Sequence, residues 1–176
     1  VDADLRPEGK SGPMVRSLES YAEYYRRWAL VWEAQALLRA RPLAGDDELA
    51  ADYVALIDPI RYPGTISEQD VREVRRVKAR VEAERLPRGA DPARHLKLGR
   101  GGLSDVEWLA QLLQLQHAGR HPGLRTTSTV AALEGAAAVG LLEAGDVVIL
   151  LRAWRLASRI RSANVIWTGR ALRWIE

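Results

Sequence analysis

The stretch LESYAEYYRRWALVWEAQALLRA, residues 18–40, decides the class of fold. Its apolar and aromatic residues recur every three or four positions, which is the period of an α-helix with one buried face. The sequence therefore predicts one amphipathic helix from Leu18 to Ala40, ended by Pro42 and Gly45. Aromatic residues at this spacing favour a role in the core over stacking against a nucleotide base. The predicted stripe consists of Tyr21, Tyr24, Trp28, Val31, Trp32 and Leu38.

The same periodicity continues along the rest of the chain. Further helices are predicted near residues 46–57, 67–86, 104–117, 127–140 and 143–164. Asp46 is the expected N-cap of the first of these helices, which should stop before Pro59. Only residues near 1–5 look extended, and one strand cannot form a sheet. The predicted fold is all-α: a helical bundle of about five to six helices, with an N-terminal strand/loop remnant of a preceding α/β domain.

The amino-acid composition restricts the kinds of protein that this chain can be. The 176 residues are enough to bury a core, and 47% of them are hydrophobic. The absence of cysteine excludes disulfides and thiolate metal sites, and fits the reducing cytoplasm. No apolar run reaches the roughly 18 residues of a membrane span, and no signal peptide is recognised. We therefore expect a cytoplasmic protein without a membrane partner.

Charge is uneven along the chain. The net charge is +3, but six arginines and no acidic residue lie between Val147 and Ile175. This stretch is either a solvated helix face or a surface for an acidic protein or phosphate groups. No DNA- or RNA-binding motif accompanies it, so nucleic acid is not an expected partner. The arginines are Arg152, Arg155, Arg159, Arg161, Arg170 and Arg173.

The segment KLGRGG, residues 97–102, precedes the helix predicted from Ser104. It matches neither a P-loop nor a dinucleotide fingerprint. One interpretation is a turn followed by a capping box, in which the Ser104 hydroxyl and the Glu107 carboxylate each accept a backbone amide of the other residue. The alternative is a phosphate site at a helix N-terminus, built from free backbone amides. The charged side chains available to such a site are Lys97, Arg100 and Asp105.

Acidic residues also stand at the N-terminal end. Asp2 and Asp4 alternate with apolar residues at the predicted strand end, and a glycine-containing loop follows them. Carboxylates in such a position suit Mg²⁺ bound to a nucleoside triphosphate. Two acidic residues alone favour an ordinary surface. Glu33, in contrast, lies among apolar residues, and we expect it to pair with an arginine.

Three blocks, taken in order, resemble the bacterial family of bifunctional glutamine synthetase adenylyltransferase/adenylyl-removing enzymes, most closely in an actinobacterial form. The blocks are VDADLRPEGKSGPMV (residues 1–15), YYRRWALVWEAQALLRARPLAGD (24–46) and KLGRGGLSDVEWLAQLLQLQH (97–117). The resemblance implies tandem nucleotidyltransferase units, each a catalytic α/β domain followed by a helical bundle. One unit transfers AMP from ATP to a tyrosine of glutamine synthetase, and the other removes it by phosphorolysis. The blocks look more like the C-terminal, adenylylating half than the adenylyl-removing half.

The resemblance also implies a division of the chain and a metal site. Residues 1–15 correspond to the end of a nucleotidyltransferase catalytic domain, and residues 16–176 to the helical bundle after it. Asp2 corresponds to the third metal-binding carboxylate of the family, whereas the family's Gly-Ser and Asp-x-Asp elements are absent here. We therefore expect this chain alone neither to bind Mg²⁺–ATP tightly nor to transfer AMP.

Family members share the pattern K-x-G-x-G-G-x-x-D-x-E, which runs here from Lys97 to Glu107. This implies that the turn and the helix start face the catalytic cleft of the intact enzyme. The implied catalytic residues are Asp2, Lys97, Asp105 and Glu107, with Asp2 also a metal ligand. The implied nucleotide-binding residues are Arg6, Gly99, Gly101 and Gly102.

The resemblance finally implies Mg²⁺ as cofactor, ATP as substrate, and glutamine synthetase and the PII signal protein as partners. Two interpretations of the bundle remain open. It either closes over ATP as part of the transferase, or serves as a docking module for glutamine synthetase or PII. In the second case the contact would be the face with Arg152, Arg155 and Arg159.

Overall fold

The computed structural model describes residues 6–86, 88–89 and 91–169, so the strand predicted near residues 1–5 lies outside the described residues. The described chain is all-helical, with seven α-helices and no strand, which confirms the predicted fold class. The α-helices are α1 (Leu18–Trp28), α2 (Val31–Leu37), α3 (Asp47–Arg61), α4 (Glu68–Arg85), α5 (Leu103–His117), α6 (Thr129–Ala138) and α7 (Ala144–Thr168). Short 3-10 helices are η2 (Gly9–Ser11), η3 (Pro92–Arg94) and η4 (Pro122–Leu124).

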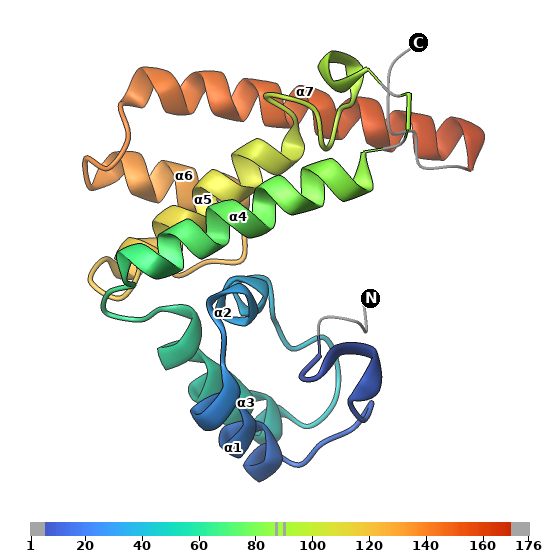
Figure 1. The fold of residues 1–176 in the computed structure, drawn as a ribbon. Coiled ribbons are helices and arrows are strands. Elements are labelled where there is room, and N and C mark those ends of the chain that lie inside the picture. The colour runs from blue at the N-terminus through green and yellow to red at the C-terminus, as the bar shows by residue number, and fades with distance from the viewer. Residues whose placement is uncertain (1–5, 87, 90, 170–176) are drawn as a thin grey trace.

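The helices form two groups, with α1, α2 and α3 below and α4 to α7 above in Figure 1. Helix α2 joins the groups, because it packs on α3 and also on α4 and α5. Two side-chain hydrogen bonds reinforce this joint. The Gln35 amide donates to Gln111 Oε1 of α5 at 2.7 Å, and the Arg39 guanidinium donates to the Thr129 hydroxyl of α6 at 2.9 Å.

Three apolar clusters hold these groups together. The first links α2, α4, α5 and α6, the second links α5, α6 and α7, and the third links α1, α2 and α3. Each fully buried leucine contributes about 1.5–3 kcal/mol relative to an exposed one. The side chains that best represent the clusters are Leu38, Leu115 and Leu124 in the first, Val106 and Leu133 in the second, and Tyr25 and Ile57 in the third.

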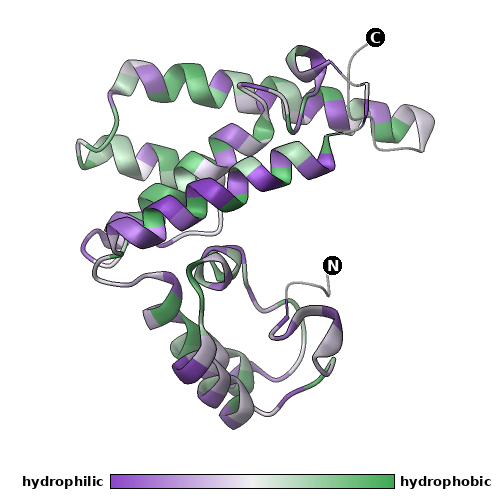
Figure 2. Cartoon of the chain, in the orientation of Figure 1, coloured by the Kyte–Doolittle hydropathy of each residue, from purple (hydrophilic) through white to green (hydrophobic). Residues whose placement is uncertain are grey.

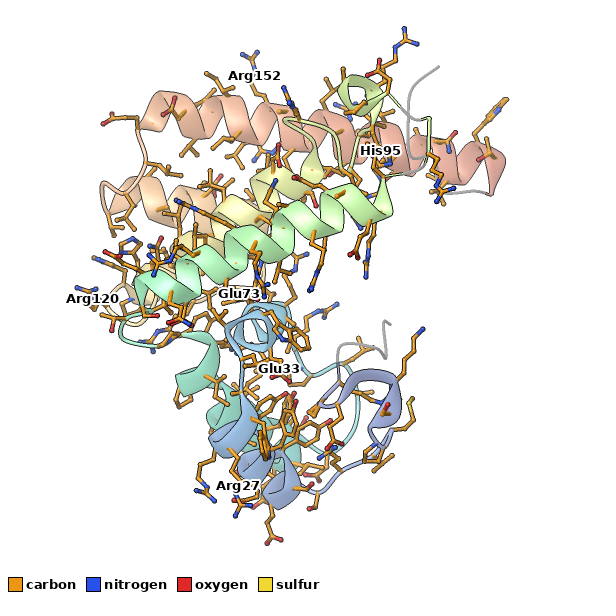
Figure 3. All side chains as sticks on the ribbon, in the orientation of Figure 1. Arg27, Glu33, Glu73, His95, Arg120 and Arg152 are labelled. Atoms are coloured by element: carbon orange, nitrogen blue, oxygen red, sulfur yellow. The ribbon has the colours of Figure 1, made fainter. Side chains whose placement is uncertain are left out.

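The helix predicted over residues 18–40 is two helices, because the chain becomes extended at Ala29 and Leu30. The Glu33 carboxylate accepts the Leu30 amide at 3.0 Å and so caps the start of α2. The same buried carboxylate accepts the Tyr24 hydroxyl at 2.8 Å (Figure 3). The predicted pairing of Glu33 with an arginine is therefore wrong: a tyrosine and a backbone amide take its place. Trp28, predicted on the buried stripe, is 66% exposed beside this break.

Helix α3 begins at Asp47, directly after the predicted N-cap Asp46, whose carboxylate accepts the Leu49 amide at 2.8 Å. It does not stop before Pro59, as predicted, but continues to Arg61. Arg61 is buried and donates to the carbonyls of Leu37 and Ala40, at 3.3 and 2.7 Å. These bonds go to one carbonyl at the end of α2 and one just after it, so tertiary contacts outweigh the proline at the last turn of α3.

Helices α4, α6 and α7 lie close to their predicted ranges. Ser67 and Ser128 act as N-caps of α4 and α6, each accepting a backbone amide. Figure 2 shows α4 as mostly hydrophilic. Its valine seam consists of Val71, Val74, Val77 and Val81, and of these only Val74 is fully buried. None of the described helices is long and apolar enough to cross a membrane.

Candidate functional site

The glycine-rich turn, residues 95–102, folds back on itself just before α5. The Gly99 amide donates to the His95 carbonyl at 2.8 Å, and the Gly102 amide donates to the Gly99 carbonyl at 2.9 Å. At the start of α5, the Leu103 and Ser104 amides donate to carbonyls of Leu96 and Lys97, at 3.0 and 2.9 Å. The backbone amides that open the helix are therefore already satisfied by the turn.

Each of the three glycines is required by the shape of this turn. A Cβ at Gly99 would lie 2.0 Å from the Pro92 carbonyl oxygen, and one at Gly102 would lie 2.8 Å from the Gly99 carbonyl oxygen. Gly101 has a φ of +73°, in the left-handed region that favours glycine. The structure thus gives the glycines a role in building the turn, and their implied contact with a nucleotide stays a prediction.

The predicted capping box at Ser104 and Glu107 is wrong. Helix α5 begins one residue earlier, at Leu103, with Gly102 as N-cap and no side-chain cap from that residue. Asp105 caps instead: its carboxylate accepts the Gly101 amide at 2.7 Å. Ser104 is buried inside the helix, and its amide already donates to the Lys97 carbonyl, so the Glu107 carboxylate has no free amide of Ser104 to accept.

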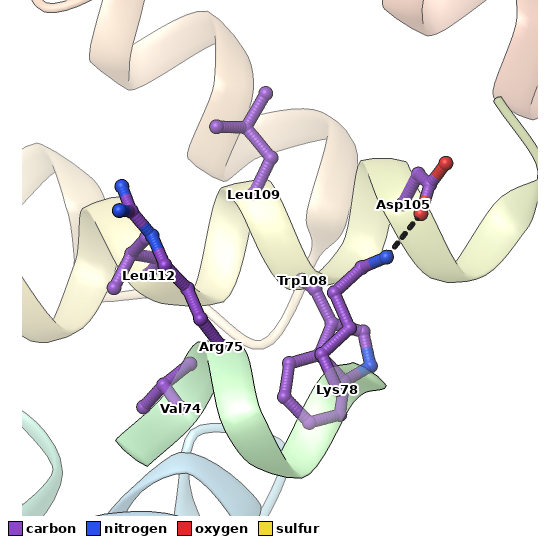
Figure 4. Close-up of a pocket in the computed structure, with 7 residues that line it drawn as sticks. All are labelled: Val74, Arg75, Lys78, Asp105, Trp108, Leu109 and Leu112. Carbon is purple, nitrogen blue, oxygen red and sulfur yellow. Dashed lines mark hydrogen bonds and ion pairs between the residues drawn. The ribbon is translucent and has the colours of Figure 1, made fainter. Parts of the chain in front are cut away.

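Asp105 also binds Lys78, which reaches across from α4 (Figure 4). The same ammonium contacts Glu82 one turn further along α4. Burial alone would raise the pKa of Asp105, but the Lys78 ammonium and the Gly101 amide outweigh it and hold that pKa below its ordinary value. Burial would lower the pKa of Lys78, and its two carboxylate partners raise it instead. Both groups are therefore charged at neutral pH, and Lys78 ties the turn to α4.

A cavity of about 270 Å³ opens beside this bridge, between α4 and α5. Its walls are apolar, with Trp108 and Leu109 from α5 and Val74 from α4, as Figure 4 shows. Arg75 and Lys78 stand at the α4 side, and Asp105 closes one end. The site therefore combines a rigid turn, a neutralised ion pair and a small apolar hollow.

Comparisons with known proteins show that the sequence is similar to one family of enzymes. The chain is 64% identical to the bifunctional glutamine synthetase adenylyltransferase/adenylyl-removing enzyme of Streptomyces avermitilis and 62% identical to that of Leifsonia xyli, in each case over 97% of the chain. It is 56% identical over 97% of its length to the enzyme so named from Mycobacterium avium. The chain belongs to this enzyme family. It spans about 17% of the length of each of these relatives.

Two family models match different parts of the chain. The model of glutamate-ammonia ligase adenylyltransferases matches residues 1–55, which include α1 and α2. The model of GlnD PII-uridylyltransferases matches residues 74–171, which include most of α4 and all of α5 to α7. The glycine-rich turn and its Lys78 anchor fall within the second match.

The structure brings some of the residues implied by the family resemblance together and separates others. Gly99, Gly101, Gly102 and Asp105 meet at the start of α5. Arg6 lies elsewhere, in the N-terminal loop before η2, where its guanidinium donates to the Gly12 carbonyl at 2.9 Å and the Lys10 carbonyl at 3.2 Å. Asp2, the implied metal ligand, lies outside the described residues.

Lys97 and Arg100 project from the turn with exposed side chains. Glu107 is half-buried on the first turns of α5, and among the described residues it has no hydrogen-bonding or ionic partner. The amides of residues 97–99 and 101–105 all donate within the chain. An anion at this turn would therefore be met by side chains, and not by a cradle of free amides.

Sequence reasoning missed Lys78. The residue lies within the valine seam of α4, four positions after Val74 and four before Glu82. A lysine near the buried edge of that helix was therefore the sequence feature that could have pointed to its role. Its partner Asp105 is distant in sequence, and only the packing of α4 on α5 brings the two together.

Proposed function

We propose that this chain is the helical part of an enzyme that transfers AMP from ATP to a tyrosine of glutamine synthetase. The observation that carries the proposal is the 64% identity over 97% of the chain to an enzyme named for this activity. Residues 1–15 are then the end of the nucleotidyltransferase domain, and residues 16–176 the bundle after it. The three sequence blocks assign the chain to the adenylylating half, in a cytoplasmic enzyme that also responds to the PII signal protein.

ATP is the AMP donor in this proposal, and Mg²⁺ is the metal that would neutralise its phosphates. The described residues contain no group of three or more histidine, cysteine or acidic residues able to hold a metal ion. A magnesium site therefore rests on Asp2, outside the described residues, together with carboxylates from elsewhere in the enzyme.

The glycine-rich turn supplies the bundle's contribution. Its internal hydrogen bonds and the Lys78–Asp105 bridge hold Lys97 and Arg100 on a preorganised backbone, facing outward. Their cations suit phosphate oxygens or the acidic surface of a protein substrate. Because Lys78 keeps Asp105 ionised, Asp105 acts as a positioning residue for the turn and not as a proton donor. Glu107, which has no partner among the described residues, is available to orient groups in the cleft.

Substitution of Lys97 in the full-length enzyme tests this assignment. Lys97→Ala should slow AMP incorporation into glutamine synthetase by about 100-fold or more, the usual cost of losing one preorganised donor in an active site. Arg88→Ala is the matched control, because Arg88 is an exposed cation in the same connection. Equal rates for Lys97→Ala, Arg88→Ala and the wild type would remove Lys97 from the site.

A further inference from the structure

Helix α7 has two different long faces. One face packs on α5 and α6, where Val147 and Leu151 are buried. The opposite face carries large apolar side chains in water: Val148 is 54% exposed, Ile149 67% and Leu156 61%. Single exposed aliphatic residues are ordinary, but three within three turns of one helix face form a patch that is unusual for a free surface.

The same outer face carries arginines at helical spacing. Arg152, Arg155 and Arg159 are all exposed, and Figure 3 shows Arg152 projecting away from the rest of the chain. Arg155 has one distant ion pair, with Glu134 at 3.8 Å. Within the described part of the chain, Arg152 and Arg159 have no ion-pair partner, and no acidic residue follows Asp146 on α7. Apart from the Arg155–Glu134 pair, the positive charge of this face is therefore not compensated among the described residues.

Together, the exposed aliphatic residues and the arginines indicate which kind of partner this face can bind. Val148 to Arg159 covers about 17 Å of helix axis, at 1.5 Å per residue. Guanidinium groups pair with carboxylates in a bidentate manner, while the aliphatic residues between them gain free energy only against another apolar surface. Nucleic acid would leave those aliphatic residues facing phosphates, and the face between Val148 and Arg159 carries no exposed aromatic residue for stacking on bases.

We infer that the outer face of α7, defined by Val148, Ile149, Arg152, Arg155, Leu156 and Arg159, docks an acidic protein surface with an apolar centre. This inference rests on the proposed function for the identity of the partner, which is the glutamine synthetase that receives AMP. The face lies on α7, which is separated in the chain from the glycine-rich turn by α5 and α6, so in this inference it holds the protein substrate without touching the reacting atoms. Its contribution belongs to binding of glutamine synthetase, and turnover of the bound complex does not depend on it.

The test uses the full-length enzyme and purified glutamine synthetase, with binding and AMP incorporation measured separately. Arg152→Glu/Arg159→Glu should weaken direct binding and raise the KM for glutamine synthetase by about tenfold or more, with kcat at saturation unchanged. Ile149→Ser should weaken binding in the same sense, because an apolar centre is part of the surface. Arg72→Glu/Arg80→Glu, on the exposed face of α4, is the matched charge-reversal control and should bind like the wild type.

The outcomes separate this inference from the proposed function. If the wild type transfers AMP and the α7 variants keep its KM and its binding, the docking face is overturned and the function stands. If the wild type transfers no AMP to glutamine synthetase, the function fails; arginine-dependent binding would still support the face, and absence of binding would overturn it. Arginine-dependent binding to phosphatidylglycerol vesicles in place of glutamine synthetase would also overturn it, since the partner would then be a lipid surface.

Discussion

Gly99 illustrates how much of the site depends on single atoms. The residue is buried, and the Pro92 carbonyl occupies the space that a Cβ would need, 2.0 Å away. The contact is with backbone and not with a flexible side chain, so neither partner can move without opening the turn. Packing within the turn is therefore enough to explain the glycines near α5, without a ligand.

Gly99→Ala should lower the free energy of unfolding by about 2–4 kcal/mol, because the turn must open to admit the methyl group. Denaturant unfolding of this chain measures the change. Gly64→Ala is the control: a Cβ there meets nothing within 4 Å, and the change should stay within about 0.5 kcal/mol. A Gly99→Ala protein as stable as the control would contradict the tight turn.

The Lys78–Asp105 bridge gives the turn a pH dependence. The lowered pKa of Asp105 means that its stabilising contribution is present above the ordinary carboxyl pKa and is lost as the pH falls through the lower, folded value. The raised pKa of Lys78 means that its contribution is present below the ordinary lysine pKa and is lost only as the pH rises through the higher, folded value. The bridge is therefore intact from about pH 5 to pH 9.

Lys78→Met should destabilise the chain by about 1 kcal/mol across that range, because methionine keeps the apolar stem and loses the charge. The difference from the wild type should shrink as the pH falls below the ordinary carboxyl pKa and through the lower pKa of Asp105 in the folded wild type, where this carboxylate becomes protonated. Thermal unfolding at several pH values checks both statements. Arg80→Met, at an exposed position of α4, provides the baseline, and a Lys78→Met effect that stays constant down to pH 2 would rule out the bridge.

At the scale of single residues, sequence reasoning found the turn and misplaced its cap. Ser104 and Glu107 satisfy the spacing of a capping box, and Asp105 equally suits the first turn of a helix. The choice between them depends on which amides the turn has already satisfied, and this is a property of the backbone path through Leu96 and Lys97. That path could not be derived from local spacing.

At the scale of elements, the break between α1 and α2 is the main departure from the predicted helices. Periodicity runs through Ala29 and Leu30 without interruption, and neither residue is a helix breaker. The break is stabilised by Glu33, which ties the Leu30 amide to the Tyr24 hydroxyl. Pro59 shows the opposite case, since a residue that usually ends a helix lies inside α3. In both places a tertiary partner determines where the helix begins or ends. The sequence pattern alone does not identify that partner.

Removal of Glu33 should therefore affect both helices. Glu33→Ala should cost about 2–3 kcal/mol, because it leaves the Leu30 amide and the Tyr24 hydroxyl without their acceptor. Tyr24→Phe should cost about 1 kcal/mol. In a double-mutant cycle, the two changes together should cost less than their sum, because both remove the same hydrogen bond. Strict additivity in denaturant unfolding would show that the two side chains do not interact.

At the scale of the whole molecule, the all-helical class followed from periodicity and from the lack of a second strand. The two-group arrangement did not, because it depends on α2 packing on both sides and on bonds such as Gln35 to Gln111 and Arg39 to Thr129. The family assignment depended on motif blocks separated by long intervals, and the comparisons confirm it. The site residues stay predictions, because their chemistry involves parts of the enzyme outside this chain.

The most direct test of the account measures two reactions of the full-length enzyme, wild type and Asp2→Asn: incorporation of AMP into glutamine synthetase and its phosphorolytic removal. Loss of a metal-binding carboxylate should reduce incorporation by about 100-fold or more and leave removal intact. That result would place the chain in the adenylylating half, with Asp2 at its metal site. Loss of removal alone would assign the chain to the other half, and unchanged rates of both reactions would contradict the assignment of Asp2 and of the bundle to an adenylyl-transfer site.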